Sequence, residues 1–374
     1  MTELRHQLHR IPETAFNESE TAQHIVQFLK NYAPAQIITG LGGAGVAAVF
    51  KGAQKGPTLM FRCELDALPI AETNQVEYRS THEGNGHQCG HDGHMAMVAG
   101  LAPLLQANPL PCGRVILLFQ PAEETGEGAQ KVLDDPQFKD LTPDYIFALH
   151  NLPGYAQGQM VCRQGTFASA SRGMIITLTG APSHASHPEN GRNPALAVSQ
   201  ITQTLLALPT LHTPFGQAAL ITPVQLKVGQ PAFGTSPGDG EVMFTLRCHR
   251  NEQMQALIKQ AEHAVQHLAK AHNLDCEISY TENFDAVENN PEAQKMLETA
   301  LEELEKEVHY KPEPFAWSED FGVFTAAFPG AMFGLGSGEK QPQLHNEDYN
   351  FPDQILPEGT RVFWQLVQQE LGGA

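Results

Sequence analysis

The chain of 374 residues carries 42 acidic and 23 basic side chains, so its formal net charge is −19. This excess of negative charge disfavours nucleic acid and anionic membranes as partners, because phosphate recognition needs a basic surface. A hydrophobic content of 41% indicates a globular protein with room for two domains, and no apolar run reaches the roughly 18 residues that cross a bilayer. The sequence opens without the apolar core of a secretory signal, and its six cysteines are scattered. We therefore predict a reduced, cytoplasmic protein.

Helix-like and strand-like segments alternate in the first part of the chain. Apolar residues recur at helical spacing near the N-terminus, and continuous apolar runs of strand length follow at intervals. This alternation predicts a mixed or mainly parallel sheet that is covered by helices. The helical segments are 20–32 and 94–107, and the strand segments are 45–52, 58–70, 114–124 and 144–153.

The rhythm changes after about residue 170. A strand, a helix, two strands, a long helix and a final strand follow one another, which is the β-α-β-β-α-β order of a ferredoxin-like domain. The first rhythm then resumes to the C-terminus. We therefore predict an α/β fold with a larger mixed α/β catalytic domain, residues 1–168 plus 286–374, and an inserted ferredoxin-like domain, residues 169–285.

The densest chemistry lies in the stretch GHQCGHDGHMAMVAG, residues 86–100. Divalent metals of the zinc type bind imidazole nitrogen, thiolate and carboxylate oxygen, and all three occur here. Cys89 and His91 lie two residues apart, so their side chains point the same way if the segment is extended. We predict that these two bind metal, and that His87, Asp92 and His94 are candidates to orient the ligands.

Further ligand candidates stand where later buried strands end. Glu123 and Glu124 close one apolar run, and His150 closes the next. His345 follows the last strand-like run of the chain. Ligands of open α/β sheets bind beyond the carboxyl ends of the strands. The conjunction of these residues with the Cys-x-His motif predicts one shared metal site with an open position for water.

Two other interpretations of these motifs fit less well. GLGGAG, residues 40–45, matches the G-x-G-x-x-G dinucleotide fingerprint, but a strand-like run follows it where that motif must open a helix. Cys89 could be a nucleophile activated by a histidine, but the glutamate pair would then have no role. Any one of these histidines alone is more often a surface or core residue, so the metal site depends on their conjunction.

Motifs along nearly the whole chain match those of one metallopeptidase family. RCELDALPI resembles its R-A-D-M-D-A-L-P-I, GHQCGHDGHMAM its M-H-A-C-G-H-D-G-H-T-A-M, and LLFQPAEETGEGA its F-Q-P-A-E-E segment. LRHQLHRIPETAFNESET, ALHNLP, SHASHPENGRNP, SEDFGVF and LHNEDYNF match its other motifs in order. The chain thus resembles the amidohydrolase branch of the aminoacylase and carboxypeptidase-G metallopeptidases, the branch of hippuricase, indole-acetyl-amino-acid hydrolases and N-acetyl-diaminopimelate deacetylase.

This resemblance implies two divalent cations per chain, zinc or manganese in the first place and nickel or cobalt as alternatives. Such cations lower the pKa of a bound water. Glu123 would be the general base, Asp66 would orient a metal-bound histidine, and His184 of the inserted domain, the lid, would help to hold the oxyanion. The implied metal ligands are Cys89, His91, Glu124, His150 and His345.

The sequence departs from the family on the lid. AFGTSPGD stands where A-F-N-V-I-P is usual, so Gly234 replaces an asparagine that is expected to help hold the substrate. This leaves Arg247 as a candidate clamp for a substrate carboxylate. Glu64 and Asn193 each stand where the family has an aspartate. The hydrolytic centre is thus intact, whereas the side that selects the substrate is altered.

These observations predict a metal-dependent hydrolase that cleaves the amide bond of N-acyl amino acids or related small amides. A metallo-carboxypeptidase or dipeptidase is the enzymatic alternative. A non-catalytic binding protein of the same fold is the other alternative, and the presence of both Glu123 and Glu124 argues against it. A small-molecule substrate is the expected partner, and a homodimer through the lid is an option because this family's lid often carries a dimer contact.

Overall fold

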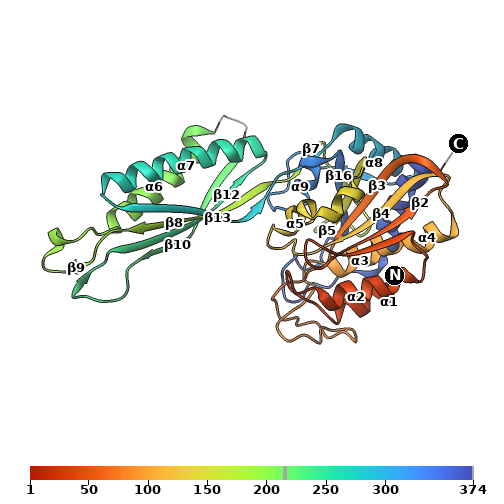
Figure 1. Cartoon of the computed structure of the whole chain (residues 1–374), viewed down its shortest axis with the longest axis horizontal. Coiled ribbons are helices and arrows are strands. Elements are labelled where there is room, and N and C mark those ends of the chain that lie inside the picture. The colour runs from red at the N-terminus through yellow and green to blue at the C-terminus, as the bar shows by residue number, and fades with distance from the viewer. Residues whose placement is uncertain (214–216, 373–374) are drawn as a thin grey trace. The chain divides into compact units, whose positions relative to one another are not determined.

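The computed structural model describes residues 1–213 and 217–372, and it divides into two compact units (Figure 1). The first unit contains both ends of the described chain. The second unit is almost entirely one inserted stretch. The first unit comprises Met1–Phe167, Val287–Pro314 and the residues from Glu319 onward, and the second comprises Ala168–Ala286 and Phe315–Ser318.

A mixed eight-stranded sheet forms the centre of the first unit. Its strand order is β1-β2-β4-β3-β5-β16-β6-β15. The inner strands β4, β3, β5 and β16 run parallel to one another, whereas β2 pairs with β4 and β6 pairs with β16 in the antiparallel sense. This arrangement confirms the predicted mixed sheet. The strands are β1 Gln36–Leu41, β2 Gly45–Lys51, β3 Gln54–Glu64, β4 Cys112–Gln120, β5 Tyr145–Pro153, β6 Met160–Cys162, β15 Val308–Tyr310 and β16 Gly330–Gly338.

The inner strands are buried on both faces because helices cover the sheet. β3, β4, β5 and β16 carry nearly continuous apolar runs, as parallel strands between two helical layers do. Helix α8 shows how the sequence fixes an element: Asn290 accepts hydrogen bonds from two backbone N–H groups at its start, and Pro291 is its first residue. The helices of this unit are α1 Thr2–His9, α2 Ser19–Lys30, α3 His91–Ala99, α4 Leu101–Ala107, α5 Gly128–Asp134, α8 Pro291–Glu303, α9 Gly322–Ala327 and α10 Leu356–Leu371.

The second unit is a four-stranded antiparallel sheet with two helices, in the order β8-α6-β10-β12-α7-β13 along the chain. The strand order in the sheet is β10-β12-β8-β13, which confirms the predicted ferredoxin-like fold. Buried and partly exposed residues alternate along β12, as expected for a sheet with one covered face. The elements are β8 Ala170–Thr179, β9 Ser183–His184, α6 Ala195–His212, β10 Ala219–Val228, β11 Thr235–Ser236, β12 Asp239–Cys248, α7 Asn251–Ala271 and β13 Asp275–Phe284.

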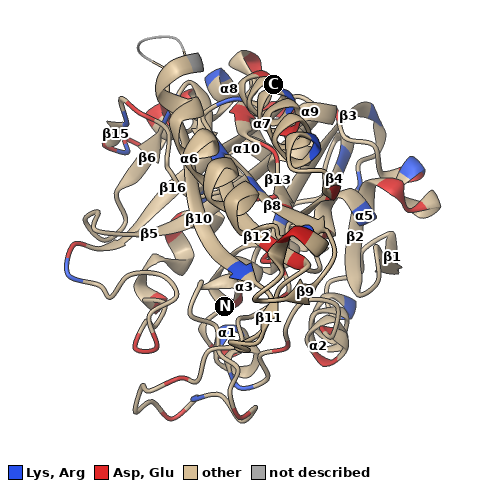
Figure 2. Ribbon diagram, turned by 90° about the vertical axis from the view of Figure 1, so that its left-hand side faces the viewer, with Lys and Arg blue, Asp and Glu red and all other residues tan. Residues whose placement is uncertain are grey.

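Smaller elements complete the chain. β7 and β14 form a two-stranded sheet, and β9 pairs with β11. Figure 2 shows the basic residues scattered among the acidic ones, without a continuous basic stripe along any element. Among the described residues, no helix is long and apolar enough to cross a membrane. The remaining elements are β7 Gly165–Ala168, β14 Val287–Asn289 and the short 3-10 helices Pro136–Leu141, Pro188–Asn190 and Asp353–Ile355.

Candidate metal centre

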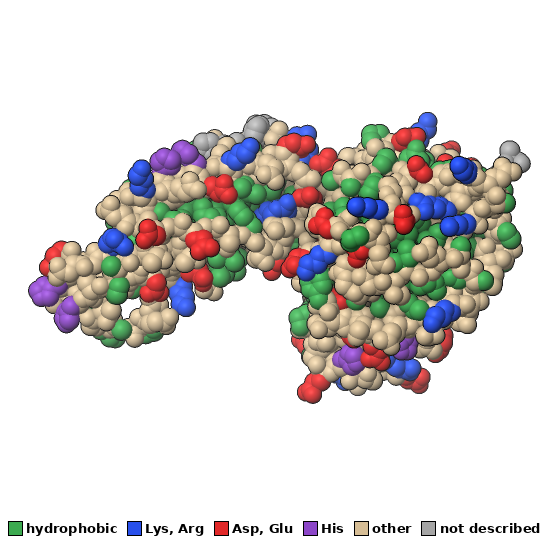
Figure 3. All heavy atoms as spheres, in the orientation of Figure 1, with side chains coloured by type: hydrophobic (Ala, Val, Ile, Leu, Met, Phe, Trp, Pro, Cys, Tyr) green, Lys and Arg blue, Asp and Glu red, His purple; other side chains and the backbone are tan. Residues whose placement is uncertain are grey.

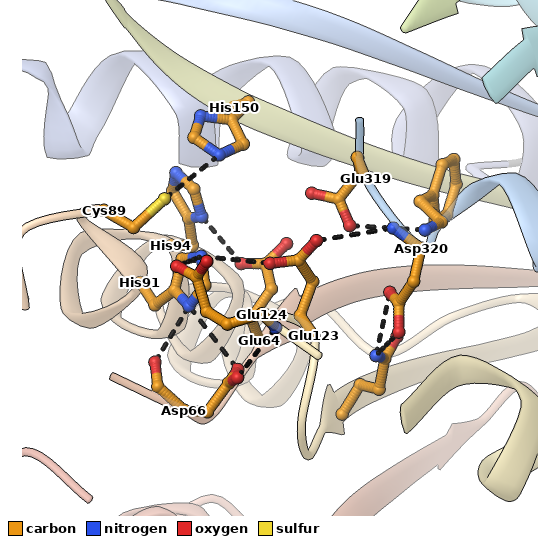
Figure 4. Close-up of polar contacts among 12 residues, drawn as sticks. Glu64, Asp66, Cys89, His91, His94, Glu123, Glu124, His150, Glu319 and Asp320 are labelled. Atoms are coloured by element: carbon orange, nitrogen blue, oxygen red, sulfur yellow. Dashed lines mark hydrogen bonds and ion pairs between the residues drawn. The ribbon is translucent and has the colours of Figure 1, made fainter. Parts of the chain in front are cut away.

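The candidate centre lies at the carboxyl ends of the inner strands of the large sheet (Figure 4). Glu123 and Glu124 follow the end of β4 after two residues, and His150 lies in the second half of β5. His345 follows β16, in a backbone conformation with φ of 66°. These strands belong to the consecutive run β4-β3-β5-β16 of the sheet, so residues far apart in the sequence meet at one edge.

Cys89 and His91 meet through a turn, which corrects the expectation of an extended segment. Gly90 between them has φ of 89°, and His91 is the first residue of helix α3. A Cβ at Gly90 would lie 2.7 Å from the side-chain nitrogen of Asn151, so only glycine fits. All nine residues of α3 are buried, and this burial fixes His91 inside the unit.

The predicted ligands form two groups that share one residue. Cys89, His91 and His150 form one group, and Cys89, Glu124 and His345 form the other; the ligand atoms within each group lie within 4.8 Å of one another. Sγ of Cys89 is 3.6 Å from Nε2 of His150. Nε2 of His345 is 3.6 Å from Oε2 of Glu124. A thiolate common to two donor groups suits two neighbouring cations.

Backbone carbonyl groups orient the two buried histidines. Nδ1 of His91 is 2.8 Å from the carbonyl oxygen of Asp66, and Nδ1 of His150 is 2.9 Å from that of Asn151. A carbonyl oxygen can only accept, so each Nδ1–H donates and each Nε2 is turned toward the centre, as in many metal sites. The carboxylate of Asp66, expected to orient a histidine, lies farther from the His91 ring, at 3.6 Å.

The turn after β4 sends the two glutamates into different surroundings (Figure 4). Oε1 of Glu123 accepts a hydrogen bond from the backbone N–H of Asp320, at 3.3 Å. Oε1 of Glu124 is 3.8 Å from Nε2 of His91, and the backbone N–H of Glu124 donates to Oδ2 of Asp66 at 2.9 Å. Both glutamates therefore place an oxygen within 3.9 Å of Nε2 of His91, and Glu123 is in addition tied to a second segment of the chain.

Sequence reasoning missed a buried ion network beside Glu123. Arg62 on β3 contacts Glu64, and its Nη2 lies 2.9 Å from Glu319 and 2.6 Å from Asp320. Glu123, Glu319 and Asp320 place ligand-type oxygens within 4.8 Å of one another. The motif SEDFGVF holds the last two residues, but nothing in the sequence tells that they meet a residue nearly 200 positions earlier.

Two of the three remaining candidates of the cysteine-histidine stretch, His94 and Asp92, bind side chains from other segments of the chain. His94 binds Glu64 through Nδ1, at 2.6 Å. Asp92 accepts from Arg5 at 3.0 Å and lies 2.8 Å from Nδ1 of His9. The ring of His87 is buried, and neither of its nitrogens has a hydrogen-bond partner among the described residues. Asp92 thus ties the start of α3 to Arg5 and His9 of α1, whereas His94 lies beside the proposed ligands, with its ring centroid 5.6 Å from that of His91 and 4.9 Å from that of His150.

The pKa shifts of the centre show that its surroundings disfavour further negative charge and favour a positive charge. Burial raises the pKa of the Cys89 thiol and of Glu123 well above their ordinary values, and it raises the pKa of Glu124 to about 7; nearby carboxylates add to each shift. Burial lowers the pKa of His150 to about 3. Burial also opposes the charge of His91, but the surrounding carboxylates raise its pKa to about 10. The centre therefore favours a cation near Nε2 of His91.

Two buried atoms test whether the residues fit a metal ion. Nε2 of His91 and Oε1 of Glu124 have no hydrogen-bond partner among the described residues, and they face each other across 3.8 Å. Buried polar atoms in this state are uncommon. With Nδ1–H donating to a carbonyl group, Nε2 becomes an electron-pair donor like Oε1 of Glu124 once it gives up its own proton, and a divalent cation in place of that proton would satisfy both atoms. The donor set fits zinc-type ions.

His184 lies in the second unit, on the short strand β9 that pairs with β11. Its side chain is exposed, and Figure 3 shows histidines at the surface of the end that carries β9. Nδ1 of His184 accepts from the backbone N–H of Ser186 at 3.2 Å and lies 2.6 Å from its Oγ. Because Nδ1 accepts, the proton of the neutral ring is on Nε2, which is left as a donor.

Arg247 and Gly234 lie in the same unit as His184. Nη1 of Arg247 donates to the carbonyl oxygen of Ala316 at 2.9 Å and to Oγ of Ser318 at 3.0 Å, and Arg247 lines a cavity of about 170 Å³. Gly234 is adjacent to the strand partner of His184, and its carbonyl oxygen accepts from the N–H of Ala185. A Cβ at Gly234 would meet no atom within 4 Å, so the structure gives no steric reason for glycine there.

The fold and the donor groups together define the class of metal-dependent hydrolases with a mixed α/β unit and an inserted ferredoxin-like unit. The sequence profile of peptidase family M20/M25/M40 matches residues 60–369, and the chain belongs to this family.

Relatives of known name cover the whole chain. An N-acetyldiaminopimelate deacetylase of Lactobacillus helveticus is 28% identical over 100% of this chain and 98% of its own length. A hippurate hydrolase of Campylobacter jejuni is 28% identical over 98% of this chain and 96% of its own length. Among solved structures, a dinuclear metal-binding M20 peptidase of Bacillus subtilis is 25% identical and superposes with a TM-score of 0.84. The match spans 100% of this chain and 98% of that peptidase. The chain is thus similar, end to end, to amide-cleaving hydrolases.

Proposed function

We propose that this hydrolase cleaves the amide bond of N-acyl amino acids or related small amides with two divalent cations, zinc or manganese. The observation that carries the proposal is the pair of donor groups that share Cys89. The relatives named a deacetylase and a hippurate hydrolase, and the dinuclear peptidase, support it. The proposed ligands are Cys89, His91, Glu124, His150 and His345.

The chain's own residues supply the proton transfers. A cation held by these ligands would polarise the carbonyl oxygen of the substrate and lower the pKa of a bound water. Glu123 is the general base: it takes a proton from the attacking water and returns it to the leaving amine. Its hydrogen bond from the N–H of Asp320 holds one carboxylate oxygen, so the other is directed toward the side of His91, at 3.9 Å. Asp66 positions both His91 and the backbone of Glu124.

We assign the second unit, proposed as a lid over residues 169–285, two roles in the same reaction. His184 donates from Nε2 to the oxyanion that forms at the attacked carbonyl, and its contact with Ser186 supports this because the contact fixes the required tautomer. Arg247 binds the carboxylate of the amino-acid part of the substrate, since a guanidinium suits planar carboxylates. The catalytic domain in this proposal comprises residues 1–168 plus 286–374.

One experiment separates this function from its alternatives. Purified protein is assayed on a panel of N-acetyl and N-benzoyl amino acids and of dipeptides, with metal content measured on the same sample. Turnover of the N-acyl amino acids with up to two metal ions per chain is expected. Preference for dipeptides would favour a carboxypeptidase or dipeptidase. Metal without turnover of any compound would favour a binding protein.

We also propose that the chain forms a homodimer through β10 and α6 of the second unit. β10 is an edge strand, and its side chains Leu220, Val224 and Leu226 are all more than half exposed. α6 contacts β10 and bears no Asp, Glu, Lys or Arg in its 18 residues. A second copy is the favoured occupant, because two chains of net charge −19 repel each other least where the surface is uncharged, and an antiparallel pair of edge strands is self-complementary.

The mass of the protein in solution tests the dimer. Light scattering should give twice the chain mass for the native protein. Val224→Lys with Leu226→Lys should give monomers, because two charged side chains would face their copies. Tyr310→Lys, on the edge strand β15 of the other unit and also more than half exposed, is the matched control and should remain a dimer. A native monomer, or a dimer that survives both lysines, contradicts the proposal.

A further inference from the structure

The turn that carries the glutamate pair contains a residue in a conformation that its side chain disfavours. Ala122, directly before Glu123, has φ of 52° and is fully buried. A positive φ suits glycine, and other residues hold it only where the surroundings impose it. The turn is also compact: a Cβ at Gly128 would lie 1.7 Å from the carbonyl oxygen of Pro121. Contacts with neighbouring residues must therefore hold Ala122 in this conformation.

Glu18 supplies the contact that holds Ala122. It is the residue before helix α2, it is fully buried, and its Oε1 accepts the backbone N–H of Ala122 at 2.7 Å. On the other side of Ala122, its carbonyl oxygen accepts the N–H of Gly128 at 3.1 Å. Both backbone groups of Ala122 are thus bound, the N–H by a segment far away in the sequence and the carbonyl oxygen by a residue of the same turn.

Three carboxylates from three segments bind backbone N–H groups of the glutamate turn and of the start of helix α5 that follows it. Glu18 binds the N–H of Ala122, Asp66 binds the N–H of Glu124 at 2.9 Å, and Asp320 binds the N–H of Ala129 at 2.9 Å. Asp66 lies beside the donor groups, and Asp320 belongs to the ion network around Arg62. Glu18 alone comes from the N-terminal loop, and it touches neither the proposed ligands nor Glu123 in any described hydrogen bond or ion pair.

We propose that Glu18 is a positioning residue. It holds the backbone of Ala122 at positive φ, so that Glu123 is placed to act as general base and Glu124 to bind metal. The proposal rests on the proposed roles of the two glutamates and deepens them. Without the contact, Ala122 relaxes toward negative φ, and the turn that follows it rotates. Glu124 would then leave the donor group and Glu123 would leave the N–H of Asp320.

The contact needs an acceptor oxygen and not a charge. Burial raises the pKa of Glu18 to about 7, and the nearby charge of Asp66 adds to this. A glutamine offers the same carbonyl-type acceptor without the charge, so Glu18→Gln should keep the turn. Glu18→Leu fills the space but accepts nothing. Ala122→Gly removes the cause of the strain, because glycine adopts positive φ without help.

The experiment measures the zinc affinity of these variants with a chromophoric chelator as competitor, and kcat on the best substrate of the panel. Glu18→Leu should bind zinc about 10- to 100-fold more weakly and lose a similar factor in kcat, the scale on which loss of a group that orients a metal ligand acts. Glu18→Gln should resemble the native protein. Adding Ala122→Gly to Glu18→Leu should restore most of both quantities.

Glu13→Leu is the matched control. Glu13 lies in the same loop and also accepts a backbone N–H, that of Thr21 at 2.8 Å, but its side chain has no described hydrogen bond to the glutamate turn. Its loss should lower the melting temperature without changing zinc affinity or kcat. If Glu18→Leu behaves like Glu13→Leu, Glu18 is merely structural and the proposal is overturned.

Two further outcomes keep this proposal distinct from the proposed function. If Glu124→Gln keeps native zinc affinity, the metal centre itself is wrong, and Glu18 has no ligand to position. If Glu124→Gln weakens zinc binding but Ala122→Gly fails to rescue Glu18→Leu, only the role of Glu18 is overturned. Should Glu18→Leu not fold, recovery of folding and zinc binding in the double variant supports the proposal, and lack of recovery overturns it.

Discussion

Two of the histidines with proposed roles in hydrolysis, His91 and His184, occupy opposite surroundings. His91 is fully buried, opens a helix that is itself buried, and is oriented by the carbonyl group of Asp66. His184 is exposed on a two-residue strand, and among the described residues its Nδ1 has a hydrogen-bond partner in Ser186 alone, two residues away. A buried side chain is held by many segments at once, whereas an exposed one is held locally. Changes at the first should therefore disturb metal and stability, and changes at the second should disturb turnover alone.

Metal removal should have the largest effect and should act on the buried centre only. Chelation is expected to abolish hydrolysis and to lower the melting temperature, because an ion that binds only the folded state stabilises it. Zinc affinity should fall as pH drops, since Cys89 binds as thiolate. His184→Ala should show the same zinc-dependent rise in melting temperature as the native protein. Full activity in metal-free protein would contradict the assignment of the centre.

The two glutamates should separate proton transfer from metal binding within the buried region. Glu123→Gln keeps the hydrogen bond to Asp320 but cannot carry a proton, so kcat should fall by roughly 10²–10⁴-fold with metal content near native. Glu124→Gln removes a ligand and should lower metal occupancy as well. Metal analysis and kcat on the same samples decide. Equal metal loss in both variants, with native turnover in Glu123→Gln, would show that the roles are misassigned.

His184→Ala should lower kcat by about 10²–10³-fold, the usual loss for one oxyanion donor. Metal content and melting temperature should stay native, because the side chain is exposed and far in sequence from every proposed ligand. His187, whose ring centroid is 6.1 Å away, is the matched control and should tolerate alanine. A near-native kcat in His184→Ala would remove the lid histidine from the chemistry.

The fold could be predicted where its signal is local. The β-α-β-β-α-β order of the second unit is written in the succession of residues 170–285, and the structure has that order. The order of the eight-stranded sheet could not be predicted, because β16 pairs with β5 and β15 pairs with β6 across more than a hundred residues. Pairing of that kind depends on tertiary packing and leaves no periodicity in the sequence.

The site residues also divide into those with a local signal in the sequence and those without one. Cys89, His91, Glu124, His150 and His345 stand out by residue type, and the structure brings their ligand atoms into two groups. The turn at Gly90 was missed because spacing alone does not reveal a positive φ. Arg62, Asp320 and Glu18 were missed because a buried ion pair or a bound backbone N–H has no local pattern.

Ser186→Ala should lower kcat less than His184→Ala does, and the comparison tests how His184 acts. Ser186→Ala removes the oxygen 2.6 Å from Nδ1 of His184 but keeps the backbone N–H that donates to it. The tautomer is therefore retained, and only the ring orientation loosens. We expect kcat to fall a few-fold, with KM and metal content unchanged. A loss as large as that of His184→Ala would show that the hydroxyl group acts on the substrate directly.

The smallest effect is expected at His9, which contacts the first turn of α3, and this effect on the melting temperature should depend on pH. His9 is buried between Asp92 and Glu72. Burial opposes its charge, but the two carboxylates, Asp92 first, overcome this and raise its pKa to about 9 from an ordinary value of 6.5, while Arg5 opposes them. A pKa that is higher in the folded state gives stability that is complete below pH 6.5 and is lost as pH rises through 9.

His9→Gln should therefore melt a few degrees below the native protein at pH 6, roughly the shift that a change of one or two kcal/mol produces, and the difference in melting temperature should disappear toward pH 9.5. His263→Gln, at an exposed position of α7, should show no such gap. A gap for His9→Gln that stays constant from pH 6 to 9.5 would mean that packing, and not the charge of His9, supports the helix that begins with His91.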